Sequence, residues 1–189
     1  MPILDLMYNE GPLATTPVRD EPIVSLGRVL LAGVIAGLAD ALFALGLQVY
    51  YAGRFAPADI FRGIASGLLG PAAREGGAAA AALGVALHFG FAFFWVLLYA
   101  TAYRLSPWLR RAAARPLGAI ALGFAFGAIV WLGMNYVAKP IGGIAPTRLL
   151  QLYFLVMTLG HGVVVGLPTV LLVRAAGWRS RHLTSTEQS

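Results

Sequence analysis

Four long apolar runs, separated by short polar segments, dominate the pattern of this chain. The second run, from Gly76 to Tyr103, lies in a stretch without formal charge between Glu75 and Arg104, and His88 is its only histidine. At a helical rise of about 1.5 Å per residue, it exceeds the roughly 20 residues that cross a bilayer. We therefore expect a transmembrane helix here.

Three further runs predict three more spans of the same kind. They lie between Arg28 and Arg54, between Arg115 and Lys139, and between Arg148 and Arg174. Pro168 lies in the last of these runs, and because a proline leaves the carbonyl four residues earlier without a donor, it predicts a kink near Val164. The pattern as a whole predicts an all-α protein, an integral membrane four-helix bundle.

The segment between the first two spans is too polar and too interrupted to cross a membrane. Ile60, Ile64 and Leu68 form an apolar stripe of period four, which predicts a short helix over residues 57–70. This helix is expected either to lie flat on the membrane interface or to enter the membrane as a re-entrant segment. The flat placement is favoured, because Arg62 would need a partner at depth.

The chain divides into three parts on this interpretation. Residues 1–24 hold four prolines and no helical periodicity, and are expected to form a loosely ordered cytoplasmic tail. Residues 25–176 form the four-span membrane domain, and residues 177–189 form a polar cytoplasmic tail. Asp5 and Glu10 stand where a signal peptide would carry basic residues, so the first span is expected to remain as an anchor.

Composition and charge agree with a membrane protein. Hydrophobic residues make up 59% of the chain and charged residues 12%, about half the charged share of a soluble domain. The net charge is +6, but the basic residues are scattered and form no tract, so we expect no nucleic-acid partner. The chain has no cysteine, which excludes disulfides and thiolate metal sites.

The distribution of basic residues predicts the orientation. Nine of the Lys and Arg residues fall on the side of the two tails and the 104–115 connection, and five fall on the other side. The positive-inside rule therefore places both termini in the cytoplasm. Trp95, Tyr99 and Tyr103, spaced at i, i+4 and i+8 near one end of the second span, are expected to form an aromatic belt at the interface.

Three polar residues are predicted to lie near the middle of the bilayer. Counting along the helices places Asp40, His88 and His161 at a similar depth, each on an inward face. A carboxylate at this depth costs about 2.5–3.5 kcal/mol, so a chain that keeps one usually uses it or pairs it. Two interpretations stay open: a cluster that binds a proton, a cation or a substrate group, and a hydrogen bond that only fixes helix register.

Other chemistry has weaker support. Two histidines on two helices of a bundle suit a bis-His b-type haem, but Asp40 would be an awkward neighbour, and two lone histidines are a weak signal. A zinc site of His88, His161 and Asp40 is allowed by ligand type, with no spacing motif to support it. Hydrolase and nucleotide-binding motifs are absent from the sequence. We therefore expect no enzymatic activity, no cofactor and no metal.

Small residues predict close helix contacts in the first and third spans. Gly33 and Gly37 share a face with Asp40, and Gly123 and Gly127 are spaced four apart. Faces of this kind suit packing within the chain, self-association as a homo-oligomer, or docking in a larger membrane complex.

Three stretches resemble the YagU-like family of small bacterial inner-membrane proteins. They are His88–Tyr103, Met134–Pro146 and Gly160–His161, and the resemblance covers roughly residues 76–174. It implies an inner-membrane location, no established enzymatic activity and a loose link to acid tolerance. That link would suit a histidine-containing cluster, since an imidazole charges as the pH falls through about 6.5.

Two functions from different classes follow as expectations. The first is a small proton-linked or cation-linked transport or acid-stress protein that uses the Asp40, His88 and His161 cluster. The second is a noncatalytic accessory or structural subunit of a membrane complex. In both, the lipid bilayer is the main surrounding partner.

Overall fold

The computed structural model describes residues 24–149 and 151–174, so the predicted tails lie outside the described residues except at their inner edges. All regular secondary structure within these ranges is helical. Four helices are long and apolar enough to cross a membrane: Leu26–Ala52, Gly77–Leu105, Pro116–Ile141 and Leu152–Arg174. The all-α class and the four candidate spans are therefore confirmed.

Two of the four spans contain a π-helical segment. The first two spans are the unbroken helices α1 (Leu26–Ala52) and α3 (Gly77–Leu105). The third consists of α5 (Pro116–Gly133), the π segment η3 (Met134–Ala138) and α6 (Lys139–Ile141). The fourth consists of α7 (Leu152–His161), the π segment η4 (Gly162–Gly166) and α8 (Leu167–Arg174).

Both interruptions relate to a proline. Near Val164, where a kink is predicted, the helix is π-helical over η4, which ends two residues before Pro168. The third span continues beyond Lys139 to Ile141, and η3 ends two residues before Pro140, so the π turn lies where the proline has no N–H to donate.

Shorter helices connect the first three spans. The predicted helix between spans one and two is present as α2 (Pro57–Leu69), followed by the 3₁₀ turn η2 (Pro71–Glu75). Asp59 in the first turn of α2 pairs with Arg62, and also with Arg54 at 2.5 Å. A further helix, α4 (Pro107–Ala114), begins after Ser106, whose hydroxyl accepts a hydrogen bond from the Leu109 N–H at 3.3 Å.

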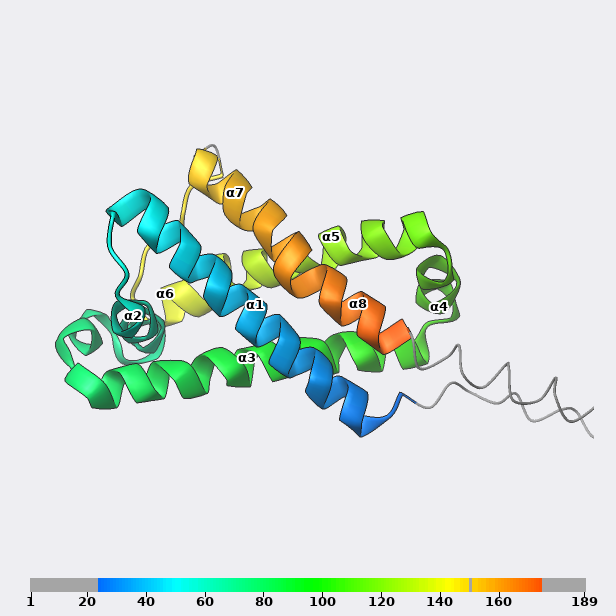
Figure 1. Cartoon of the computed structure of the whole chain (residues 1–189), viewed down its shortest axis with the longest axis horizontal. Coiled ribbons are helices and arrows are strands. Elements are labelled where there is room, and N and C mark those ends of the chain that lie inside the picture. The colour runs from blue at the N-terminus through cyan, green and yellow to red at the C-terminus, as the bar shows by residue number, and fades with distance from the viewer. Residues whose placement is uncertain (1–23, 150, 175–189) are drawn as a thin grey trace, which may run out of the picture.

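The spans form two crossing pairs (Figure 1). In that view α1 and α7–α8 pass in front of α3 and α5. Helix α4 lies at the end of the molecule where α1 begins and α8 ends, and α2 lies at the opposite end. Helix α2 is seen nearly along its own axis, so it runs crosswise to α3, against which it packs.

The largest core cluster lies among α1, α3, α5 and α8 and includes Val96, Val170 and Val173. Tyr99 and Tyr103 belong to this core and are only 4% and 5% exposed, so the predicted aromatic belt is wrong for both. The spacing of these residues correctly defines a shared face, but that face turns inward. The Tyr99 ring lies 5.0 Å from that of Phe126 on α5.

Glycines allow the helices to approach closely inside the chain. A Cβ at Gly37 would come within 2.8 Å of the Phe89 ring of α3. A Cβ at Gly127 would come within 2.3 Å of the His161 carbonyl oxygen, and the Gly166 position is equally close to the backbone at Gly123. The predicted close packing is confirmed, and these small faces are occupied by the chain's own helices.

Candidate functional site

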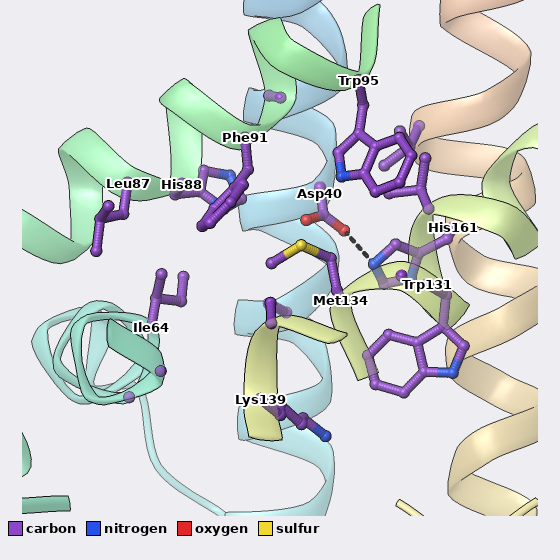
Figure 2. Close-up of a pocket in the computed structure, with 18 of the residues that line it drawn as sticks. Asp40, Ile64, Leu87, His88, Phe91, Trp95, Trp131, Met134, Lys139 and His161 are labelled. Atoms are coloured by element: carbon purple, nitrogen blue, oxygen red, sulfur yellow. Dashed lines mark ion pairs between the residues drawn. The ribbon is translucent and has the colours of Figure 1, made fainter. Parts of the chain in front are cut away.

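Asp40 and His161 meet between the first and fourth spans. Asp40 lies in the middle of α1, and His161 is the last residue of α7. The distance from Asp40 Oδ1 to His161 Nε2 is 3.5 Å, and the His161 side chain is buried. Figure 2 shows this contact as a dashed line. Two of the three residues placed at one depth from the sequence are therefore in contact.

The other ring nitrogen of His161 fixes its tautomer. His161 Nδ1 lies 2.7 Å from the carbonyl oxygen of Met157, one turn earlier on α7. A carbonyl can only accept, so Nδ1 must carry a hydrogen and donate it. In the neutral imidazole Nε2 then has no hydrogen, and it faces Asp40 as a bare acceptor.

His88 is engaged elsewhere. Its Nε2 lies 2.8 Å from the Gly37 carbonyl oxygen on α1, to which it donates a hydrogen bond, and its ring meets Phe61 and Phe89 edge-on. This bond reaches the turn of α1 that precedes Asp40 but not Asp40 itself. The predicted cluster is thus a pair, Asp40 and His161, with His88 as a neighbour across the same cavity.

The arrangement does not fit the two metal-containing alternatives. No group of three His, Cys, Asp or Glu side chains in residues 24–149 and 151–174 is placed to hold a metal ion. For a bis-His haem, both imidazoles would have to present a free nitrogen to one iron. The Nε2 atom of His88 instead faces the Gly37 carbonyl, and His161 is held by Met157 and Asp40.

A cavity of about 640 Å³ adjoins the pair. It lies between α1, α2, α3, the third span and α7, and both Asp40 and His161 form part of its wall. Figure 2 shows the Asp40 carboxylate at this wall, facing Leu87, Phe91 and Ile64 across the gap. The lining is mostly apolar, so the few polar groups determine what the cavity can bind.

Trp95 completes the surroundings of Asp40. Its indole N–H is buried and has no hydrogen-bond partner among the described residues. In Figure 2 the indole nitrogen is on the side of the ring that faces Asp40. A buried donor without a partner normally costs free energy, so an acceptor entering the cavity would be stabilised here.

A second polar group, not identified as a site from the sequence, lies near the α6 end of the third span. Asn135 is fully buried. Its Oδ1 accepts hydrogen bonds from Lys139 Nζ and the Thr147 N–H, both at 2.9 Å, and its Nδ2 donates to the Thr147 carbonyl oxygen at 3.0 Å. Lys139 Nζ also donates to Thr147 Oγ1 at 3.0 Å. The network joins the helix to the loop that follows it.

Trp131 connects this network to the Asp40–His161 pair. Lys139 Nζ lies 5.0 Å from the centre of the Trp131 ring, a cation–π distance. The Trp131 ring also contacts the His161 ring, with 5.1 Å between the ring centres. Lys139, Trp131 and His161 therefore form a continuous series of contacts. The one sequence signal for this group was the i, i+4 spacing of Asn135 and Lys139.

Both π segments border the site. Segment η3 begins three residues after Trp131, and η4 begins directly after His161. Such segments within α-helices frequently occur at functional sites. The Gly127 contact with the backbone at His161 also sets how closely α5 approaches this point.

Comparison with known proteins gives no relative. No protein-family model, no curated protein and no solved structure matches the chain. The resemblance to the YagU-like family therefore stays a prediction, and the functional argument depends on the geometry of the site.

Proposed function

We propose that this chain is a multi-pass protein of the bacterial inner membrane that binds a proton at the Asp40–His161 pair and links it to transport of a solute. The supporting observation is the combination of two distances on one imidazole. Nδ1 of His161 is 2.7 Å from the Met157 carbonyl oxygen, and Nε2 is 3.5 Å from Asp40 Oδ1.

These distances favour a shared proton. Because Nδ1 donates to Met157, a neutral His161 and an ionised Asp40 would place two acceptors against each other. The contact becomes attractive when one more proton is bound, either on the imidazole or on the carboxyl group. Loss of that proton would weaken the contact between α1 and α7, so protonation is tied to the packing of two spans.

The cavity favours transport over a purely structural role. A hydrogen bond that only fixed helix register would need no adjoining space, yet both members of the pair line a cavity of about 640 Å³. Ligand pockets in proteins commonly measure about 300–1,000 Å³. The pair thus lies where a bound molecule would contact it.

The alternative of an accessory subunit has less support. It was suggested by small-residue faces suited to docking, but Gly37 and Gly127 contact the chain's own helices. Association with a second copy or with a larger complex stays a prediction. The proposed orientation has both termini in the cytoplasm, as the distribution of basic residues predicts.

Proton exchange by the purified protein tests this proposal. Asp40→Asn keeps the size of the side chain and its hydrogen-bonding ability but cannot ionise. On acidification the wild type should take up a proton that Asp40→Asn and His161→Gln do not, because each variant removes one partner of the pair. Infrared difference spectra of carboxyl and imidazole bands would measure this uptake, and liposomes with an imposed pH gradient would measure flux.

Two controls separate the pair from other groups. Glu75→Gln removes an exposed carboxylate, and His88→Gln removes an imidazole that does not contact Asp40. Both should retain the proton signal of the pair. An Asp40→Asn protein with unchanged proton uptake and flux would contradict the proposal and leave only the role in helix register.

A further inference from the structure

The cavity beside Asp40 extends to the apolar outer surface of the molecule. Several of its lining residues are large, apolar and exposed on the outside of the molecule: Leu68, Phe94, Val137 and Ile141. They belong to α2 and α3 on one side and to η3 and α6 on the other. A molecule dissolved in the bilayer would therefore reach Asp40 sideways, between these elements.

Asp40 supplies the negative charge of this cavity. It is the only acidic residue in the lining, and its polar contact within the described part of the chain is the one with His161 through Oδ1. The second carboxylate oxygen is on the cavity side in Figure 2. One oxygen thus faces His161, and the other is available to a ligand.

The basic residues of the lining are engaged or peripheral. Lys139 Nζ donates to Asn135 and Thr147 and lies on the Trp131 ring, and in Figure 2 its side chain points away from Asp40. Arg74 is exposed on η2, outside the spans. Of the remaining titratable neighbours, His88 donates to Gly37, and Tyr153 on α7 lies close enough to sense the Asp40 charge.

Aromatic rings form much of the remaining wall. Phe61, Phe91, Trp95 and Trp131 come from three different helices and line the same cavity as Asp40. The faces of aromatic rings attract cations, and their area accommodates apolar groups. A metal cation would instead require several oxygen ligands, and this lining offers few.

We propose that the cavity binds a lipophilic organic monocation, with its charge against the free oxygen of Asp40 and its apolar groups among the aromatic rings. This inference rests on the proposed proton site. The cation and the shared proton neutralise the same carboxylate, so binding of one releases the other. The linkage has the sign of an exchange: the ligand binds more tightly at high pH, when the proton has left.

Tetraphenylphosphonium is a suitable probe, because it is lipophilic, carries a permanent charge and cannot itself lose a proton. The purified protein in detergent should bind it saturably, more tightly at pH 8 than at pH 5, with release of protons into a weakly buffered solution. Asp40→Asn should weaken binding by about tenfold or more. Glu75→Gln, which removes an exposed charge outside the cavity, should bind as the wild type does.

The uncharged analogue triphenylphosphine oxide separates charge recognition from simple apolar binding. Equal binding of both probes, or equal binding of tetraphenylphosphonium by wild type and a folded, monodisperse Asp40→Asn, would overturn the inference. Absence of binding at pH 8 would overturn it as well. If the probe does not bind but the wild type still gives the infrared difference signal of Asp40, only the cation site is contradicted and the proton site is retained. If that signal is absent as well, the proposed function is also contradicted.

Discussion

Asn135 satisfies three polar groups with one amide. Its oxygen accepts from Lys139 and from the Thr147 backbone, and its nitrogen donates to the Thr147 carbonyl. The Asn135 side chain is fully buried, whereas Lys139 and Thr147 are half-buried. The position of Lys139 over Trp131 depends in part on this residue.

Replacing Asn135 by Leu should therefore destabilise the protein. The substitution removes the Asn135 hydrogen bonds to the Thr147 N–H, the Thr147 carbonyl and Lys139 Nζ, and loss of a hydrogen-bond partner inside a protein costs about 1–3 kcal/mol. The free energy of unfolding in detergent, from denaturant titration, would measure the loss. Tyr136→Phe is the matched control, because Tyr136 bonds the same Thr147 carbonyl at 3.4 Å from an exposed position. It should change stability by less than about 0.5 kcal/mol, and an equal loss in both variants would contradict this account.

The contact of α5 with η4 includes two positions where backbone meets backbone. Gly127 lies against the backbone of His161 and Gly162, and the Gly166 position lies against the backbone of Gly123. At these two positions no flexible side chain can move aside to admit an extra carbon atom. The geometry of His161 is thus set by how closely the two elements approach.

Gly127→Ala should force α5 and η4 apart. Overpacking of this kind typically costs about 1–3 kcal/mol, and here it should also disturb the contact between His161 and Asp40. Thermal unfolding in detergent would measure the first effect, and infrared difference spectra the second. Gly90→Ala on α3 is the control, because a Cβ at Gly90 meets nothing within 4 Å. It should leave stability unchanged or raise it by up to about 1 kcal/mol, and a similar loss in both proteins would show that the glycine contact is unimportant.

The elements could be predicted from the sequence more fully than their contacts. Charged residues bracket each apolar run, so the spans were placed to within a few residues. Helical rise alone brought Asp40 and His161 to one depth, and they do meet. It could not specify that His88 would turn to the Gly37 carbonyl, since that depends on helix rotation and on the space that the glycine provides.

The Asn135 network was missed for a similar reason. It exists only because the loop folds back and brings Thr147, twelve residues later, onto the helix. Likewise, the spacing of Tyr99 and Tyr103 defined a face, but the neighbours that cover this face come from distant parts of the chain. Local pattern determines elements, whereas burial depends on their assembly.

The whole molecule has two different ends. Helix α4, the start of α1 and the end of α8 lie together, and α2 lies at the other end (Figure 1). The cavity reaches α2, η2 and α6 but not α4. The 104–115 connection therefore lies at the same end as the start of α1 and the end of α8, which is the grouping that the distribution of basic residues predicts.

The orientation can be tested directly, because the chain has no cysteine of its own. In intact cells, a cysteine at Ala145 should react with a membrane-impermeant thiol reagent. One at Arg111 on α4 should react only after permeabilisation, because the excess of basic residues keeps that end in the cytoplasm. Both positions are exposed, so their accessibility within the protein is comparable. The reverse labelling would invert the orientation, and labelling of both from outside would contradict the crossing of the spans.

The π segments make the number of residues in a span part of the site. Each residue turns an α-helix by about 100°, so one residue added to a regular helix would turn everything beyond it by that angle. A π turn holds one residue more than an α turn, and it therefore absorbs such a residue. Segment η3 keeps Lys139 over the face of Trp131 in this way, and η4 keeps α8 on the core that it shares with α1 and α5. The third and fourth spans can therefore hold one residue more than a regular α-helix without a change in the position of the side chains around His161.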